Sequence, residues 1–417
     1  MLVDETVKAP NEEYIEMTFA KETATGKGLN NRFVMENCHD GTFLCTEGRI
    51  GITIGCHKPK SYRRPIADWH HMYSRQIGIG YTLFSEKKTE AKKITKQSNM
   101  YNGIHFKTIA EKSVNAIVTR LIELTNNLMQ TEYTVKVENI SEEMLNRGSA
   151  LLDELADKYK DMSVAEFNNK LKTLYAIIPR RIDNLNKKLA KRPADFQDIV
   201  AREQELYDVM KSQTNECTLE KDEGKTILEA LGIEWRDVTP EEESWIRKQL
   251  AGQKYVKAWR ITNIATEKRF NDFCKRENLT EDHGIERLFH GSRSANFWSI
   301  ITTGLTINPK GVPIQGKMFG YGTYFAPDAC KSMGYSDRYG SRWANGAECT
   351  GFLGIYKVAV GNPCEPRNVG SYNYESLHKN GYHSVWCKRG GQIGLRMDEV
   401  VVYQDCQDTI EYLVEVG

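Results

Sequence analysis

The chain has 417 residues and a formal net charge of +1, with 40% hydrophobic and 27% charged residues. This composition is typical of a soluble globular protein of roughly two to four domains, and it argues against nucleic-acid binding over the whole surface. The 10 cysteines include no Cys-x-x-Cys pair, which argues against a zinc module and a disulfide framework and favours a reducing compartment. The acidic N-terminus lacks the apolar core of a signal peptide, and no apolar run approaches the roughly 18 residues of a membrane span, so we expect an intracellular protein.

The first segment, residues 1–110, is rich in β-branched and aromatic residues and in glycine, as in GTFLCTEGRIGITIG (41–55). Such runs are typical of strands bounded by turns. Residues 51–110 also carry more Lys and Arg than Asp and Glu, and a local cluster of cations favours an anionic partner. We therefore expect a small twisted sheet with a helix and a basic surface.

The second segment, residues 111–216, nearly lacks glycine and carries apolar residues at helical spacing. Ser163 and Glu166 have the spacing of a capping box, and Pro179 follows the helix that this box would open. This segment is expected to be an all-helical domain.

The third segment, residues 217–417, returns to strands and glycines. Alternation in 351–361, 398–403 and 409–416 predicts strands, and Thr239-Pro240 with a glutamate at 242 predicts a helix start. The glycine- and proline-interrupted stretch 304–322 is expected to be a long loop, and loops of that length are usually functional or disordered.

Four ordered stretches carry the chemistry of the third segment: LFHGSR (288–293), MFGYGTYFAPDACKSMGYS (318–336), GYHSV (381–385) and MDEVVVY (397–403). Together they resemble the signature of the poly(ADP-ribose) polymerase catalytic domain. The resemblance implies a His–Tyr–Glu triad on three separate strands, at His290, Tyr324 and Glu399. It also implies that NAD⁺ is the substrate and that no metal is required.

The same resemblance implies how the nicotinamide end of NAD⁺ is held. The backbone of Gly291 would bind the carboxamide, because a glycine allows close approach. The Ser332 hydroxyl would bond the amide oxygen. Tyr335 would stack on the ring, and Tyr324 would close its other side.

Further contacts to NAD⁺ follow from the same comparison. His290 would bond a hydroxyl of the adenosine ribose, with Ser292 nearby. Glu399 would bond the nicotinamide ribose and stabilise developing positive charge, while Lys331 would face the acceptor.

The rest of the NAD⁺ site departs from the family pattern at one position. Phe325 and Ala326 are also expected beside NAD⁺, and residues 305–319 would form the loop over its adenosine and phosphate groups. That loop carries Thr306 where the family often has an arginine.

The helical segment resembles the regulatory domain that precedes this catalytic domain in DNA-dependent members. FNNKLKTLYAIIPRR (167–181) resembles its core helix, and AREQELYDVM (201–210) resembles the helix facing NAD⁺. Asp208 would occupy a family acidic position and act in regulation, whereas Gln204 stands where the family often has another acid. The alternative is a generic helical bundle.

The first segment resembles the Trp-Gly-Arg domain of the compact DNA-dependent members. Its EGRIG (47–51) matches the family's WGRVG except that Glu47 replaces the tryptophan, and a carboxylate there would repel phosphate. The alternative is a solvated basic face. The candidate contacts to DNA are Arg49, Lys58, Lys60, Arg63 and Arg64.

The expected fold is multidomain α+β: a small β-rich domain (1–110), an all-α helical bundle (111–216) and a mixed α/β split-sheet transferase (217–417). We expect an NAD-dependent protein poly(ADP-ribosyl)transferase, activated by DNA strand breaks, that modifies Asp, Glu or Ser of acceptor proteins including itself.

Three alternatives remain: a mono-ADP-ribosyltransferase of the same fold, a non-catalytic scaffold that binds DNA or NAD, and a toxin-type transferase with an Arg–Ser–Glu triad, which the His290 pattern disfavours. The protein is expected to be a monomer without a membrane partner. It would be nuclear, or cytoplasmic or in a host nucleus if its source is microbial or viral.

Overall fold

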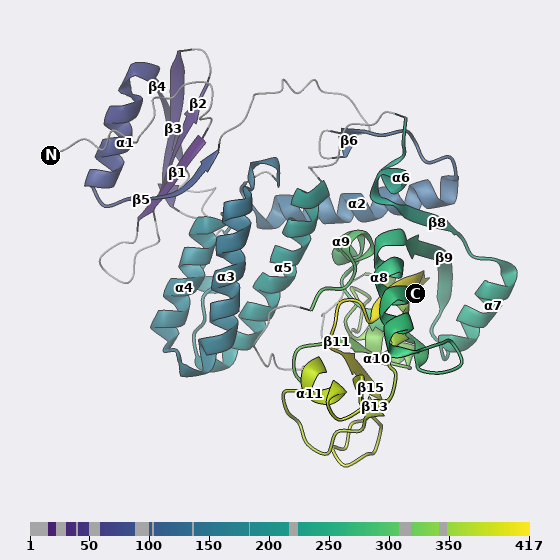
Figure 1. Cartoon of the computed structure of the whole chain (residues 1–417). Coiled ribbons are helices and arrows are strands. Elements are labelled where there is room, and N and C mark those ends of the chain that lie inside the picture. Colours follow the sequence, from purple (N-terminus) through teal and green to yellow (C-terminus); the bar gives the residue numbers. More distant parts are fainter. Residues whose placement is uncertain are drawn as a thin grey trace. The chain divides into compact units, whose positions relative to one another are not determined.

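The computed structural model describes residues 16–21, 31–38, 41–49, 59–87, 100–101, 104–135, 137–182, 184–216, 224–307, 318–341 and 348–417. Within these ranges the elements alternate between small sheets and helices (Figure 1). No helix in them combines the length and the apolarity needed to cross a bilayer.

Five antiparallel strands form the N-terminal sheet, in the order β4-β3-β2-β1-β5. The elements are β1 (Glu16–Lys21), β2 (Asn31–Asn37), β3 (Thr42–Arg49), β4 (Lys60–Pro65), α1 (Trp69–Gly78) and β5 (Thr82–Lys87). Buried side chains alternate along β3, as the two-residue period of a strand requires, whereas β2 buries Phe33, Val34 and Met35 in succession. All of these except Val34 form one core with α1, in which Phe43 and Trp69 meet edge to face with ring centroids 5.1 Å apart. The sheet and helix expected from the sequence are present.

Four helices follow the sheet. They are α2 (Lys112–Glu132), α3 (Glu142–Lys158), α4 (Val164–Ile177) and α5 (Phe196–Glu216), after the short strands β6 (Met100–Tyr101) and β7 (Ile104–His105). The Ser163 hydroxyl accepts the Glu166 N–H at 3.2 Å, so the predicted cap opens α4. The helix ends at Ile177, ahead of Pro179.

A buried ion network joins the C-terminal ends of α2 and α4 to the middle of α5. Arg180, 3% exposed, donates to the carboxylate of Glu203 at 2.7 Å and to that of Glu132 at 2.8 Å. The Tyr175 hydroxyl donates to the other Glu203 oxygen at 3.1 Å. Because buried charges are tolerated only when they are paired and hydrogen-bonded, this network fixes where α2, α4 and α5 meet.

The C-terminal strands form two further sheets, in the orders β10-β12-β16-β9-β8 and β11-β15-β14-β13. The strands are β8 (Ile233–Asp237), β9 (Tyr255–Asn263), β10 (Ile285–Gly291), β11 (Thr323–Phe325), β12 (Gly351–Ala359), β13 (Pro363–Cys364), β14 (Ser384–Cys387), β15 (Glu399–Val402) and β16 (Asp408–Val416). The helices are α6 (Ile227–Leu231), α7 (Pro240–Gln249), α8 (Ile264–Glu277), α9 (Phe297–Thr303), α10 (Ala329–Met333) and α11 (Tyr374–His378). The predicted strands and the Thr239 helix start are confirmed, and this part of the chain is mixed α/β.

The two C-terminal sheets are joined at the point where β10 meets β11. The Phe289 N–H donates to the Ala326 carbonyl at 2.8 Å, and the Ala326 N–H donates back at 3.0 Å. This bridge brings His290, at the end of β10, next to Tyr324 of β11.

By internal packing the chain divides into two compact units. One comprises residues 1–98 and 129–203, and the other comprises residues 99–128 and 204–417. The division passes through α2 and α5, so the C-terminal part of α5 belongs with the two C-terminal sheets. The boundaries expected from the sequence, at 110 and 216, stay a prediction.

Candidate active site

His290 is oriented by the backbone of the neighbouring sheet. Its Nδ1 lies 2.9 Å from the Tyr324 carbonyl oxygen, which can only accept, so Nδ1 carries a proton and Nε2 of the neutral ring is an acceptor. Phe325 and Tyr356 meet the imidazole edge to face, with centroids 5.8 and 6.0 Å away. The ring is thus fixed in one orientation and one tautomer.

Gly291 follows His290 and allows α10 to pack against the end of β10. A Cβ at this position would lie 1.8 Å from the Ser332 carbonyl oxygen. The Ser332 hydroxyl is buried and donates to the Phe289 carbonyl at 3.1 Å. Ser332 therefore lies beside Gly291, with its hydroxyl bonded to the backbone of β10.

We expect Gly291→Ala to destabilise this part of the fold, because the added methyl must displace backbone atoms. Overpacking of this kind costs about 1–3 kcal/mol and sometimes more. Thermal unfolding and NAD⁺ titration would measure the change. Gly370→Ala is the matched control, since a Cβ there meets nothing within 4 Å. Equal unfolding temperatures for the two variants would contradict the packing role.

Glu399 is the first residue of β15 and is paired with a lysine. Its side chain is 7% exposed, and Lys331 Nζ lies 2.8 Å from Oε1. The same ammonium donates to the Asp398 carbonyl at 3.2 Å. Among the described residues the Glu399 side chain has no other hydrogen-bond or ion-pair partner, so Oε2 is available to accept a hydrogen bond from a hydroxyl group.

Two tyrosines flank this carboxylate. The Tyr324 hydroxyl donates to the Gly320 carbonyl at 2.9 Å and accepts the Phe319 N–H at 3.0 Å, so it holds the end of the preceding loop. Tyr335 is 39% exposed, and burial followed by the nearby charge of Glu399 raises its pKa to about 12. Tyr335 therefore stays neutral and presents a partly exposed ring close to Glu399.

The residues after Gly291 are held by α5. Asn296 donates to the Ser292 hydroxyl at 3.0 Å and also to the carboxylate of Glu205. Arg293 Nε lies 3.6 Å from the same carboxylate, and Arg293 Nη1 lies 3.6 Å from Asp337. These contacts tie α5 to the segment that carries the Gly291–Ser292 pair.

The sequence pointed to a different acid on this helix. Asp208 accepts a hydrogen bond from the Gln204 amide at 2.9 Å, one turn away on α5. Glu205, which makes the contacts to Asn296 and Arg293, was missed. No sequence signal distinguishes it from the other acids of α5, because its role depends on a partner about 90 residues away.

Two of the predicted NAD⁺ contacts belong to the core instead of an exposed surface. Phe325 and Ala326 are each 2% exposed. Phe325 packs against Tyr356 with centroids 5.5 Å apart, and Ala326 forms the bridge to β10. Thr306 is described and exposed, whereas residues 308–317 of the predicted loop lie outside the described residues.

The candidate DNA contacts fall on one edge of the N-terminal sheet. Lys60, Arg63 and Arg64 are exposed on the edge strand β4. Glu47, in the place of the motif tryptophan, is directly opposite Lys60 in the β3–β4 pairing. Lys58 and the side chain of Arg49 lie outside the described residues.

Comparison with known proteins connects this site to one family. The model of the poly(ADP-ribose) polymerase catalytic domain matches residues 243–392. The poly(ADP-ribose) polymerase-like protein 100L of Invertebrate iridescent virus 6 is 32% identical over 173 residues, which cover 39% of this chain and 88% of that protein.

Two longer polymerases also match. Poly(ADP-ribose) polymerase 2 of Homo sapiens is 42% identical over 88 residues, and poly(ADP-ribose) polymerase 1 of Caenorhabditis elegans is 22% identical over 440 residues. The second match covers 88% of this chain. The matches span only 14% of the human protein and 45% of the nematode protein.

Proposed function

This chain belongs to the poly(ADP-ribose) polymerase family and is an NAD ADP-ribosyltransferase, and we propose that it attaches ADP-ribose to proteins, itself included, and extends it into a polymer. The acceptors would be carboxylate or hydroxyl side chains of Asp, Glu and Ser. Nicotinamide is the leaving group. The observation that carries the proposal is the buried Glu399 carboxylate, which keeps one oxygen for a substrate hydroxyl.

The site residues fit the demands of this reaction. Breaking the bond between nicotinamide and ribose develops positive charge on the sugar, and a fixed carboxylate in a water-poor site stabilises that charge. Lys331 holds the Glu399 carboxylate in place through Oε1. The oriented His290 ring suits a hydrogen bond with a ribose hydroxyl, and the partly exposed ring of Tyr335 suits stacking with a flat aromatic ring.

The acceptor chemistry can be tested on the automodified protein. Ester links to Asp or Glu are cleaved by neutral hydroxylamine, whereas ether links to Ser are not. Release of label by hydroxylamine supports carboxylate acceptors, and resistance supports hydroxyl acceptors. Absence of any protein-bound label would contradict the transferase proposal for this chain's own side chains.

A DNA-break trigger is the second part of the proposal. The exposed cations of β4 support it, because Lys and Arg in a row bind the phosphate backbone without reading sequence. The Glu47 charge faces Lys60, so it offsets part of the basic edge. Nicked duplex DNA should raise the rate of nicotinamide release. Equal rates with nicked DNA, with intact DNA and without DNA would contradict activation by strand breaks. A sensor of this kind would act in the nucleus, or in the host nucleus if the source is viral.

Regulation by the helical part is proposed to act through Glu205. Its bonds to Asn296 and Arg293 restrain the segment next to Gly291, so releasing them frees the NAD⁺ site. We expect Glu205→Ala to raise the rate of nicotinamide release in the absence of DNA by about fivefold or more. Fivefold is about the smallest effect that coupling between two sites of a protein usually produces. Asp198→Ala, an exposed acid on the same helix, is the control. A rate in Glu205→Ala no higher than in the control would contradict this mechanism.

A further inference from the structure

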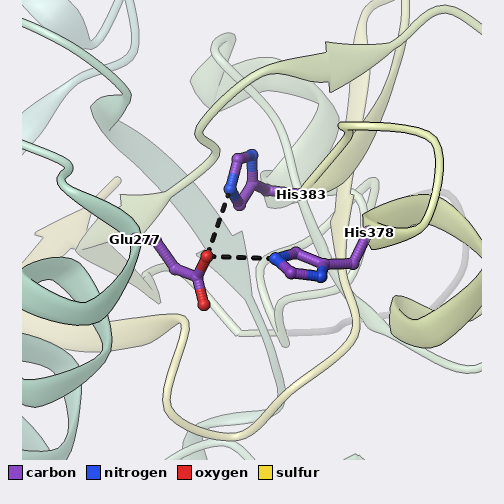
Figure 2. Close-up of side chains that lie close together, drawn as sticks. All are labelled: Glu277, His378 and His383. Atoms are coloured by element: carbon purple, nitrogen blue, oxygen red, sulfur yellow. Dashed lines mark hydrogen bonds and ion pairs between the residues drawn. The ribbon is translucent and has the colours of Figure 1, made fainter.

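A carboxylate and two imidazoles converge at a place that the transferase reaction does not use. Glu277 ends α8, His378 ends α11, and His383 immediately precedes β14. Figure 2 shows both rings turned toward the same carboxylate. His378 Nε2 lies 3.1 Å and His383 Nε2 lies 3.6 Å from Glu277 Oε2, and the three atoms all fall within 4.8 Å of one another.

These separations match the edges of a tetrahedral zinc site. With Zn–N and Zn–O bonds of about 2.0–2.1 Å, ligand atoms at a tetrahedral angle lie about 3.3 Å apart. The two observed N···O distances fall on either side of that value. The rings are 5.8 Å apart and nearly perpendicular, so their Nε2 atoms approach one point from different directions.

The carboxylate is already oriented by residues outside the cluster. Tyr374 donates to Glu277 Oε1 at 3.1 Å, and Arg276 Nε lies 2.9 Å from that same oxygen. Oε2 is the atom that faces both imidazoles. Partners of this kind fix a ligating carboxylate and are part of most protein metal sites.

We propose that Glu277, His378 and His383 form an exchangeable Zn²⁺ site, with water as the fourth ligand. Imidazole and carboxylate ligands suit Zn²⁺, and three protein ligands leave one position open. The half-exposed His378 gives the ion a route in and out. A bound ion would stabilise the sheet that contains Glu399. His383 immediately precedes β14, and Cys387 at the end of β14 pairs with Glu399 on β15.

Binding requires a rearrangement at one ligand, which limits the affinity. The Asn362 N–H donates to His383 Nδ1 at 3.1 Å, so without metal the neutral ring carries its proton on Nε2, toward Glu277. When Zn²⁺ binds Nε2 it displaces that proton, and the neutral ring then carries its proton on Nδ1. A protonated Nδ1 can no longer accept the Asn362 N–H, so this hydrogen bond is lost. Such a site exchanges its ion, in contrast to a permanent structural zinc.

Co²⁺ absorption and Zn²⁺ calorimetry on the full chain test the proposal. We expect one Co²⁺ per chain with the intense visible bands of tetrahedral coordination, displaced by Zn²⁺, and a Zn²⁺-dependent rise in the unfolding temperature. His378→Gln should lower the affinity for Zn²⁺ by more than about tenfold. Mutating a residue that only hydrogen-bonds a metal ligand already lowers affinity by about tenfold or more, and His378 is itself a ligand. His378 is half exposed, so this variant is expected to fold.

The control variant is His283→Gln, because His283 is exposed and lies outside the cluster. It should bind as the wild type does. Thiolate-to-cobalt charge-transfer bands would assign the ion to cysteines and overturn the proposal. Equal affinity in His378→Gln and wild type, or no saturable binding, would also overturn it. None of these measurements uses NAD⁺, so their outcome is independent of the transferase activity.

Discussion

Replacing Glu399 with glutamine is expected to lower kcat for nicotinamide release by about 10²–10³-fold, the usual cost of losing one preorganised group that stabilises transition-state charge. The amide keeps the size of the side chain but loses the negative charge, and Lys331 then lies beside a neutral group. Because the charge matters most in the transition state, the loss should appear in kcat more than in KM.

A steady-state assay with labelled NAD⁺ measures this change. Glu234→Gln is the matched control, because Glu234 is an exposed strand glutamate of the same catalytic part. Its kcat should equal that of the wild type. If Glu399→Gln keeps the wild-type kcat, Glu399 is not the group that stabilises the reacting sugar.

Replacing Arg180 with methionine is expected to lower the free energy of unfolding by about 3–5 kcal/mol, because the change leaves the Glu203 carboxyl, which is 5% exposed, without its ion-pair partner. Burial already raises the pKa of this carboxyl, and Arg180 is the main group that opposes the rise. Glu132 keeps two further cations, Lys188 at 3.6 Å and Arg202 at 3.4 Å, so the cost falls mainly on Glu203. Urea unfolding followed by far-ultraviolet circular dichroism measures the loss.

Arg192→Met provides the comparison for Arg180→Met. Arg192 is 76% exposed and pairs with Asp195 at 3.1 Å on the surface, where solvent screening leaves an ion pair little effect on stability. A similar small loss in both variants would mean that the Arg180 network does not hold the helices together.

Local signals allowed much of the fold to be predicted. The caps at Ser163 and Thr239 and the alternating strands depend on neighbours within a few residues, so the sequence contains their cause. The Arg180 network was not foreseen, because it joins residues separated by 23 and 48 positions. No periodicity marks such a partner.

The same distinction applies to the site. The resemblance placed His290 and Tyr324 together, and the bridge between β10 and β11 accounts for their contact. It could not indicate that Glu205 would hydrogen-bond Asn296, because the two residues are 91 positions apart and only the folded chain brings them together. Nor could spacing reveal the cluster of Glu277 with two histidines about 100 residues later.

The central claim is that this chain converts NAD⁺ into nicotinamide and protein-bound poly(ADP-ribose). The most direct test is to incubate the purified chain with NAD⁺ labelled in the adenylate phosphate, with and without nicked duplex, and to resolve the protein on a denaturing gel. We expect a ladder of long products on the chain itself, increased by nicked DNA and absent in Glu399→Gln. A single band of one ADP-ribose would contradict polymerisation, and unlabelled protein without nicotinamide release would contradict the claim entirely.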